Sequence, residues 1–216
     1  MPNWCNNYIR VRGTDQKEIQ RLADAMEKGE FCNAVIPTPD ELDITAGCVG
    51  AADSPEQIAL VEAEQRNLEK HGFRNWYDFQ VSRWGTKWDV GGDNFPLDRD
   101  EDGLGFSAGF DSAWSPPMGV AEELVNRGLS VTLYYYEPGC AYVGKYEDGV
   151  DECYDYGDYD SRTVRAAIGS ELDDFWNISE QMAEYEDENR DEFQEWYEDG
   201  VEKLKNREES LPPHSD

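Results

Sequence analysis

Three aspartates in the stretch DRDEDG, Asp98 to Gly103, have the residue type and spacing of a cation-binding loop. Asp98, Asp100 and Asp102 alternate, as do the carboxylates that converge on one hard cation at the start of an EF-hand calcium loop. The twelfth position of such a loop, however, is Gly109, where a bidentate glutamate is required. The pattern therefore favours an acidic surface turn, and a weak cation site at these three aspartates is the alternative.

Other residue types that carry catalysis are scarce or uninformative. The chain has only two histidines, His71 and His214, and neither has a cysteine or serine partner at a recognisable spacing. A His-based triad and a structural zinc site are therefore not predicted. The sequence has neither a phosphate-binding loop nor a dinucleotide fingerprint. Carboxylates are so numerous that pairs of them give no sign of acid–base catalysis, and we expect no enzyme activity, no cofactor and no metal.

The cysteines predict a reducing compartment. They are odd in number, and no two of them form a C-x-x-C pair, which is typical of reduced thiols rather than of a disulfide framework. No charged and then apolar leader is present, and no apolar run approaches the roughly 20 residues of a membrane span. We therefore expect a cytoplasmic protein of a host cell that makes no membrane contact.

Tryptophans form a second group of candidate functional residues. The segment WGTKWD places Trp84 and Trp88 on either side of a turn at Gly85, with Lys87 between them. The favoured interpretation is structural: one or both indoles are buried and lock an insertion onto a sheet, and Lys87 pairs with Asp89 or lies against an indole. The alternative is a groove for a small ligand, because aromatic residues with a few polar groups also describe pockets. The residues of this possible ligand face are Trp4, Trp84, Lys87, Trp88 and Trp114.

The charge of the chain excludes some partners and favours others. The formal net charge is −29, and positions 137–216 hold 25 acidic and 7 basic residues, a net −18 in the last third of the chain. A surface this negative repels nucleic-acid phosphates and anionic membranes and attracts basic surfaces. Direct binding of nucleic acid is therefore disfavoured, and a basic, nucleic-acid-binding protein is the expected partner.

The densest run of acids is predicted to lie on one long helix. Eleven carboxylates fall between Glu180 and Glu202, and as a continuous helix this segment would present one about every 3 Å along its axis, close to the ~3.4 Å phosphate spacing of one DNA strand. Apolar residues such as Met182 and Tyr185 recur at three- and four-residue steps and predict that the helix packs on the body or on another chain, which leaves a homo-oligomer open. The predicted partner-binding acidic face is Glu180, Glu184, Glu188, Asp191, Glu192, Glu195, Glu198, Asp199 and Glu202.

The elements that would position these residues are predicted from periodicity and capping signals. Alternation predicts strands at 7–13, 104–114 and 129–137, followed by two hairpin strands, and an extended segment at 31–37. Ser54 before Pro55 predicts a helix to His71 whose inward positions are Ile58, Val61 and Leu68. Further helices are predicted after Asp15, after Asn75 and after Pro117.

This order predicts an α+β fold, a ferredoxin-like split βαβ sandwich with an antiparallel sheet. The two βαβ halves are placed at 8–36 and 104–136, with a helical insertion between them at about 37–96. The predicted domains are 1–160, which is the sandwich with its insertion, and 161–216, which is an acidic helical extension packed on it.

Four motifs carry a resemblance to a known family. In order they are MPNWCNN, WGTKWD, AWSPP and YYEPGCAYVG, and together they span roughly residues 1–149. With them the chain resembles the YubB-type, Api-like family of plasmid and phage proteins. The resemblance implies a ferredoxin-like fold and an origin on a mobile element. It implies no catalytic residue, because the family has no established biochemical activity, and it does not cover the acidic last third.

Three functional hypotheses follow. The first is a phage or plasmid accessory protein that acts as an acidic inhibitor, a mimic of nucleic acid that occupies the binding cleft of a host defence protein. The second is a small-ligand-binding protein or enzyme that uses the tryptophan-lined face. The third is an acidic structural domain whose charge serves solubility.

Overall fold

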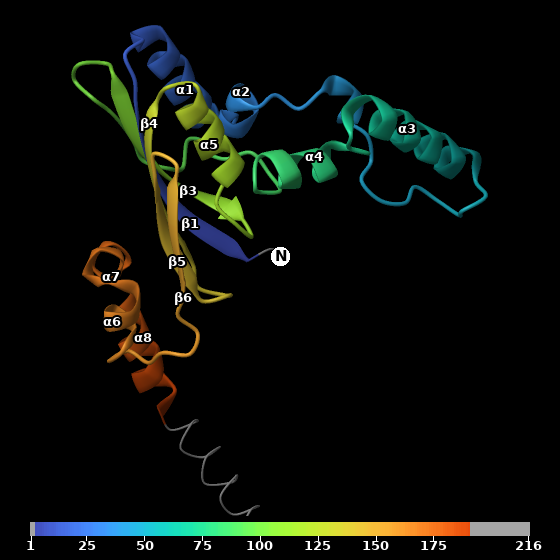
Figure 1. Cartoon of the computed structure of the whole chain (residues 1–216). Coiled ribbons are helices and arrows are strands. Elements are labelled where there is room, and N and C mark those ends of the chain that lie inside the picture. Colours follow the sequence, from blue (N-terminus) through green and yellow to red (C-terminus); the bar gives the residue numbers. More distant parts are fainter. Residues whose placement is uncertain (1–2, 191–216) are drawn as a thin grey trace, which may run out of the picture. The chain divides into compact units, whose positions relative to one another are not determined.

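The computed structural model describes residues 3–190 (Figure 1). The chain divides into two compact units, the first ending at Gly157 and the second beginning at Asp158. The first unit contains the sheet and the helices that cover it, and the described part of the second contains short helices only. Among the described residues, no helix combines the length and the apolar character that crossing a bilayer requires.

The sheet of the first unit confirms the predicted fold class. It has six strands in the order β2-β3-β1-β4-β5-β6, and every neighbouring pair is antiparallel. The strands are β1 (Trp4–Arg12), β2 (Leu97–Arg99), β3 (Gly105–Ala113), β4 (Ser130–Glu137), β5 (Tyr142–Glu147) and β6 (Val150–Asp155).

Two split βαβ units make the first four strands ferredoxin-like. Strands β1 and β2 are parallel with β3 between them, and α1 (Gln16–Lys28) begins the connection from one to the other. Strands β3 and β4 are parallel with β1 between them, and α5 (Met118–Asn126) connects them. Figure 1 shows α1 and α5 on the same face of the sheet. Strands β5 and β6 extend the sheet beyond β4 as a meander.

The core lies between this sheet face and the two helices. Inward-facing strand residues such as Ile9, Phe106 and Leu133 are fully buried against Leu22 of α1 and Leu124 of α5. Burial of this apolar surface is the main favourable contribution to folding of the first unit. Successive side chains along β1 and β3 point to opposite faces of the sheet. Every second residue therefore packs under the helices, and the residues between them lie on the helix-free face.

The segment 31–37 was predicted to be extended, and this prediction is wrong. It forms α2 (Phe31–Val35), in which Phe31, Cys32 and Val35 are buried on one helical face. The second strand of the first βαβ half is instead β2, after the helical insertion. The insertion therefore lies inside the first half and not between the halves. A short, mainly apolar segment is compatible with either a helix or a strand, so the residues that it contacts determine which of the two forms.

The insertion contains the short 3-10 turn η1 (Asp40–Leu42) and helices α3 (Pro55–His71) and α4 (Trp76–Arg83). The predicted start of α3 is confirmed, because the Ser54 side chain accepts a hydrogen bond from the backbone N–H of Gln57. Its predicted inward face is wrong. Ile58, Val61 and Leu68 are about half exposed at 50%, 52% and 45%, while the buried positions of the helix are Leu60 and Asn67.

The second unit contains α6 (Val164–Ile168), α7 (Ser170–Trp176) and α8 (Ile178–Glu188) among the described residues. Apolar residues from all three helices are buried together: Val164, Ile168, Leu172 and Ile178. Asn177, in the left-handed region with φ 55°, makes the sharp turn between α7 and α8. This small core gives α8 one buried residue and leaves most of its surface exposed to solvent.

Candidate functional site

The structure divides the tryptophans of the predicted ligand face into two kinds. Trp84 is 1% exposed, and its indole N–H donates to the carbonyl of Ile36 at 2.8 Å. Trp4, Trp88 and Trp114 are 46%, 39% and 39% exposed. Trp84 is therefore part of the core that ties the insertion to the sheet, and only the other three can meet a ligand.

Lys87 lies over the exposed aromatic rings. Its Nζ is 4.6 Å from the centroid of Trp88, 5.3 Å from that of Trp114 and 5.8 Å from that of Tyr77. Trp114 adopts φ 72°, a left-handed backbone that costs a non-glycine residue roughly 1 kcal/mol or more. The Tyr142 hydroxyl donates to the Trp114 carbonyl at 2.8 Å and helps to hold this backbone. In this cluster of Lys87, Tyr77, Trp88 and Trp114, one ammonium group therefore makes cation–π contacts with three aromatic rings.

Asp89 binds backbone amides rather than Lys87. Its carboxylate accepts hydrogen bonds from the N–H groups of Cys32, Asn33 and Val90 at 2.6, 3.1 and 2.9 Å. Two of these donors lie in the first turn of α2, where helix N–H groups have no partner within the helix. Burial raises the pKa of Asp89 above its usual range, although the three N–H groups act in the opposite direction. Asp89 is therefore the link that attaches the segment after WGTKW to α2.

A pocket of about 310 Å³ opens beside Trp4 and Trp88. The two rings are 5.9 Å apart between centroids and tilted by 41°, and Phe95 and Asp111 also line the pocket. Asp111 and Phe95 were not predicted from the sequence as residues of this face. Strand alternation in 104–114 was the available signal, since it places Asp111 on the face opposite the buried Phe110, where it pairs in register with Asn6 of β1.

The aspartates of DRDEDG meet arginines from β1. Asp100 forms ion pairs with Arg10 at 3.3 Å and with Arg12, and Asp102 pairs with Arg12 at 2.7 Å. The N–H of Leu104, together with Arg12, holds the pKa of Asp102 below its usual range. The three aspartates thus do not converge on a common cation position, and within residues 3–190 no group of three or more acidic, histidine or cysteine side chains is placed to hold a metal ion.

The predicted acidic face is described only in part. Glu180, Glu184 and Glu188 are exposed and follow one another at four-residue steps along α8, so they lie on one side of the helix. We call these three residues the α8 ridge. Successive ridge carboxylates are about 6 Å apart along the axis, at about 1.5 Å per residue. The other predicted acids lie outside the described residues: Asp191, Glu192, Glu195, Glu198, Asp199 and Glu202.

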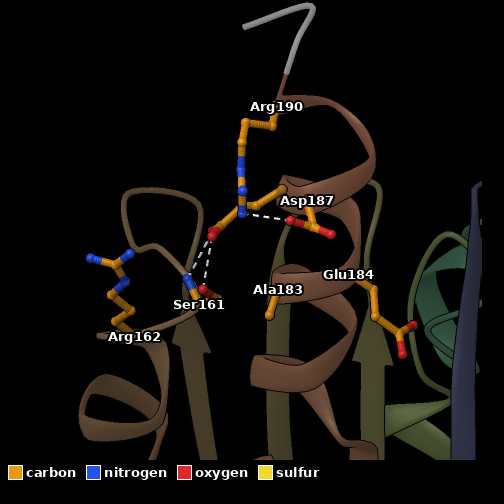
Figure 2. Close-up of a pocket in the computed structure, with 7 residues that line it drawn as sticks. Ser161, Arg162, Ala183, Glu184, Asp187 and Arg190 are labelled. Atoms are coloured by element: carbon orange, nitrogen blue, oxygen red, sulfur yellow. Dashed lines mark hydrogen bonds and ion pairs between the residues drawn. The ribbon is translucent and has the colours of Figure 1, made fainter. Parts of the chain in front are cut away.

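Other acids of α8 are engaged within the second unit. A depression of about 580 Å³ lies beside α8, and Ser161, Arg162 and Arg190 are among its lining residues (Figure 2). Glu186, which also lines it, accepts hydrogen bonds from the backbone N–H and hydroxyl of Ser161 at 2.9 and 2.7 Å. Arg190 pairs with Asp187 at 2.5 Å. These contacts separate acids with a local structural role from the α8 ridge, whose side chains have no such contact among the described residues.

Asp173 makes the second unit sensitive to acid. This buried carboxylate accepts from the Ser179 N–H, the Ser179 hydroxyl and Arg165 Nη1, each at 2.8 Å. Burial alone would raise its pKa, but these partners outweigh burial and hold the pKa below the ordinary value of 3.8. Its contribution to stability is therefore complete above about pH 3.8 and is lost as pH falls from there toward the lowered folded pKa.

We expect urea unfolding, followed at the Ser179 amide by NMR, to occur at lower urea at pH 3 than at pH 5. In Asp173→Asn the carboxylate is absent, so this acid-dependent decrease should be smaller, and the variant should lose about 1–3 kcal/mol at pH 7. Glu180→Gln, which removes an exposed carboxylate of the same unit, is the control. An equal decrease in wild type and Asp173→Asn would contradict the assignment.

Comparison with known proteins shows a weak similarity to a solved structure. No family model matches the chain, and neither does any curated protein. A crystal structure of a protein api92 from Yersinia pseudotuberculosis, of the family of unknown function DUF1281, is similar with 14% identity and a TM-score of 0.35. The match covers 74% of this chain and 96% of that one. A likeness of this strength assigns neither a family nor a function to the chain.

Proposed function

We propose that the protein binds a basic, nucleic-acid-binding protein through the α8 ridge and the acids that follow it in the sequence, as a mimic of a nucleic-acid backbone. In the finer form of the proposal, the partner is a host defence protein and the chain is its inhibitor, encoded by a phage or plasmid. The observation that carries the proposal is the row of α8 ridge carboxylates, which have no ion pair within residues 3–190, on a chain of net charge −29. The proposal requires no catalytic step.

The energetics of the α8 ridge support a role in binding. Like charges at i, i+4 oppose helix formation by roughly 0.2–0.5 kcal/mol per pair, and the ridge contains two such pairs in succession. Basic clefts that bind nucleic acid are built to neutralise regularly spaced phosphates, and the same lysines and arginines would neutralise ridge carboxylates. A cationic partner surface would relieve the repulsion within α8, so partner binding and helix stability would be coupled.

The test is capture of a partner by the immobilised full-length protein at low salt, followed by elution with duplex DNA. The expected result is a nucleic-acid-binding protein that is released by DNA and also by high salt, because the contacts are mainly between charges. Recovery of no protein that nucleic acid displaces would contradict the proposal.

Two variants with the same change in charge then distinguish an effect of the α8 ridge on binding from an effect of the total charge of the protein. The ridge variant is Glu180→Gln, Glu184→Gln and Glu188→Gln together, and the control variant is Glu30→Gln, Glu56→Gln and Glu62→Gln, three exposed carboxylates of the first unit. Both variants remove three negative charges. We expect the ridge variant to bind the captured partner about tenfold or more weakly, equivalent to about 1.4 kcal/mol, and the control to bind nearly as wild type. Equal losses would mean that only total charge matters, as in the solubility hypothesis.

A further inference from the structure

The pocket beside Trp4 and Trp88 has an unusual composition: aromatic walls and one carboxylate without a partner. Asp111 lies on β3 and is half-buried, and among the described residues no hydrogen-bond donor or cation reaches its side chain. Burial raises its pKa with no opposing interaction. Two more deeply buried carboxylates within residues 3–190 have partners: Asp89 accepts from three N–H groups, and Asp173 from Ser179 and Arg165. Asp111 differs from them because its carboxylate is only partly withdrawn from water and has no partner among the described residues, so it is free to meet a cationic group that enters the pocket.

From this geometry we propose that the pocket binds a guanidinium group, stacked on the indoles of Trp4 and Trp88 with Asp111 as its counter-ion. A guanidinium is planar, stacks on aromatic faces and offers parallel N–H donors to a carboxylate. The two indoles supply exposed ring surface, and within the described residues no cation lies over the ring of Trp4. Lys87, which lies 4.6 Å from the Trp88 centroid, is not among the residues that line the pocket.

The chemistry of the pocket argues against other ligand classes. An anion would face Asp111 in a protein of net charge −29, where repulsion opposes its approach. A bare metal ion would require several oxygen, nitrogen or sulfur ligands. The only ligand side chains in the lining are Asp89 and Asp111, and the Asp89 carboxylate already accepts three N–H groups. The volume of about 310 Å³ is at the lower end of small-ligand pockets, which suits a guanidinium with a short alkyl chain.

The wall of the pocket is held in place before any ligand arrives. Val90 is 2% exposed. The carboxylate of the neighbouring Asp89 accepts hydrogen bonds from the N–H of Val90 and from two N–H groups of α2. Gly91, at φ 101°, approaches the backbone of Met26 so closely that a Cβ would lie 2.0 Å from the Met26 carbonyl oxygen. On the opposite side, Asp111 is fixed in β3. Because these supports are made within the first unit itself, binding would have little of the pocket left to order, and preorganisation of this kind lowers the cost of association.

This inference does not rest on the proposed function, because the pocket lies in the first unit and its ligand is defined by its own chemistry. The guanidinium could belong to a small guanidino compound or to an arginine side chain on a protein. Both sources share the stacked, ion-paired group, and two probes distinguish them: methylguanidine for the free compound and N-acetylarginine amide for an arginine residue within a chain.

The experiment is a titration of the full-length protein followed by the ¹⁵N-indole signals of its tryptophans, assigned with single Trp→Phe variants. N-acetylarginine amide should shift the signals of Trp4 and Trp88 saturably, whereas the signal of Trp84, buried and bonded to Ile36, serves as the internal control and should not move. N-acetylcitrulline amide, which has the same shape without the charge, should cause no saturable shift. Comparable affinity for methylguanidine would indicate a small-molecule source, and weaker affinity for it would indicate an arginine within a chain.

Asp111→Asn should weaken binding of N-acetylarginine amide at least tenfold, and Asp93→Asn, an exposed aspartate nearby in the sequence, should leave it unchanged. An unmoved Trp84 signal shows that Asp111→Asn is folded. If the Trp84 signal moves in Asp111→Asn, Trp4→Leu is used as the binding variant instead, with the same expected loss of affinity. No saturable shift in wild type, equal binding of the citrulline compound, or unaltered affinity in the folded Asp111→Asn variant would each overturn the proposal.

Discussion

Trp84→Ala should lower the free energy of unfolding of the first unit by about 3–5 kcal/mol, a large part of the stability of a typical domain. The indole is 1% exposed, so its removal leaves a cavity in the core, and the Ile36 carbonyl loses its 2.8 Å hydrogen bond. Urea denaturation followed by far-UV circular dichroism measures the change. Trp84→Phe, which keeps a ring but not the N–H donor, should cost less, about 1–3 kcal/mol.

Trp88→Ala is the matched control, because it removes the other indole of WGTKWD. This side chain is 39% exposed, and its contacts are with the ring of Trp4 and with Lys87. Its loss should cost less than about 1.5 kcal/mol, the upper range for an aromatic pair. If the two alanine variants were equally unstable, the division of the tryptophans into one core residue and three surface residues would be wrong.

Asp89→Ala should have the second largest effect on stability, about 2–4 kcal/mol at neutral pH, because it leaves three N–H groups without their acceptor. Two of them, on Cys32 and Asn33, begin α2, and the third belongs to Val90 in the wall of the pocket. We therefore expect hydrogen exchange of the Cys32 and Asn33 amides to accelerate along with the loss in global stability. Amide exchange by NMR and urea denaturation provide the two measurements.

Asp93→Ala is the control for this variant, since Asp93 is an exposed aspartate on the same segment, and its loss should stay within about 0.5 kcal/mol. The pH dependence gives a further check. The folded pKa of Asp89 is raised by burial, so its contribution to stability is complete below the ordinary aspartate pKa and decreases as pH rises through the folded value. The difference between wild type and Asp89→Ala should therefore be larger near pH 4 than at pH 7, and the opposite trend would contradict the assigned shift.

Several elements could be predicted because their signals are local. Phe106, Ala108 and Phe110 alternate with small residues, and this local pattern predicts a strand whatever lies beside it. The structure has strand β3 at these positions. Capping chemistry is equally local: Ser54 and Asn75 accept the N–H bonds that begin α3 and α4, as predicted from their types. The ferredoxin-like order followed from the succession of these elements, together with known rules of connection.

Elements with weak periodicity were decided by their partners. The apolar run at 31–37 forms α2 because Asp89, more than fifty residues away, caps its first turn. Strand β2 has three residues and exists through its pairing with β3. On α3 the apolar residues Ile58, Val61 and Leu68 have the spacing of one helical face, but that face is about half exposed and not buried. Periodicity reports which residues could share a face, and only the packed neighbours decide whether that face is buried.

By itself, the sequence determined the charge of this protein, its strands and capped helices, and the residue types available for chemistry, because each of these depends on composition or on neighbours a few positions apart. The tertiary structure decided which tryptophan is core and which are surface, that Asp100 and Asp102 meet arginines, and that Asp111 faces Trp4 and Trp88 without a partner. These outcomes depend on contacts between residues far apart in the chain. Such contacts are set by the register and packing of the sheet, which no local pattern encodes.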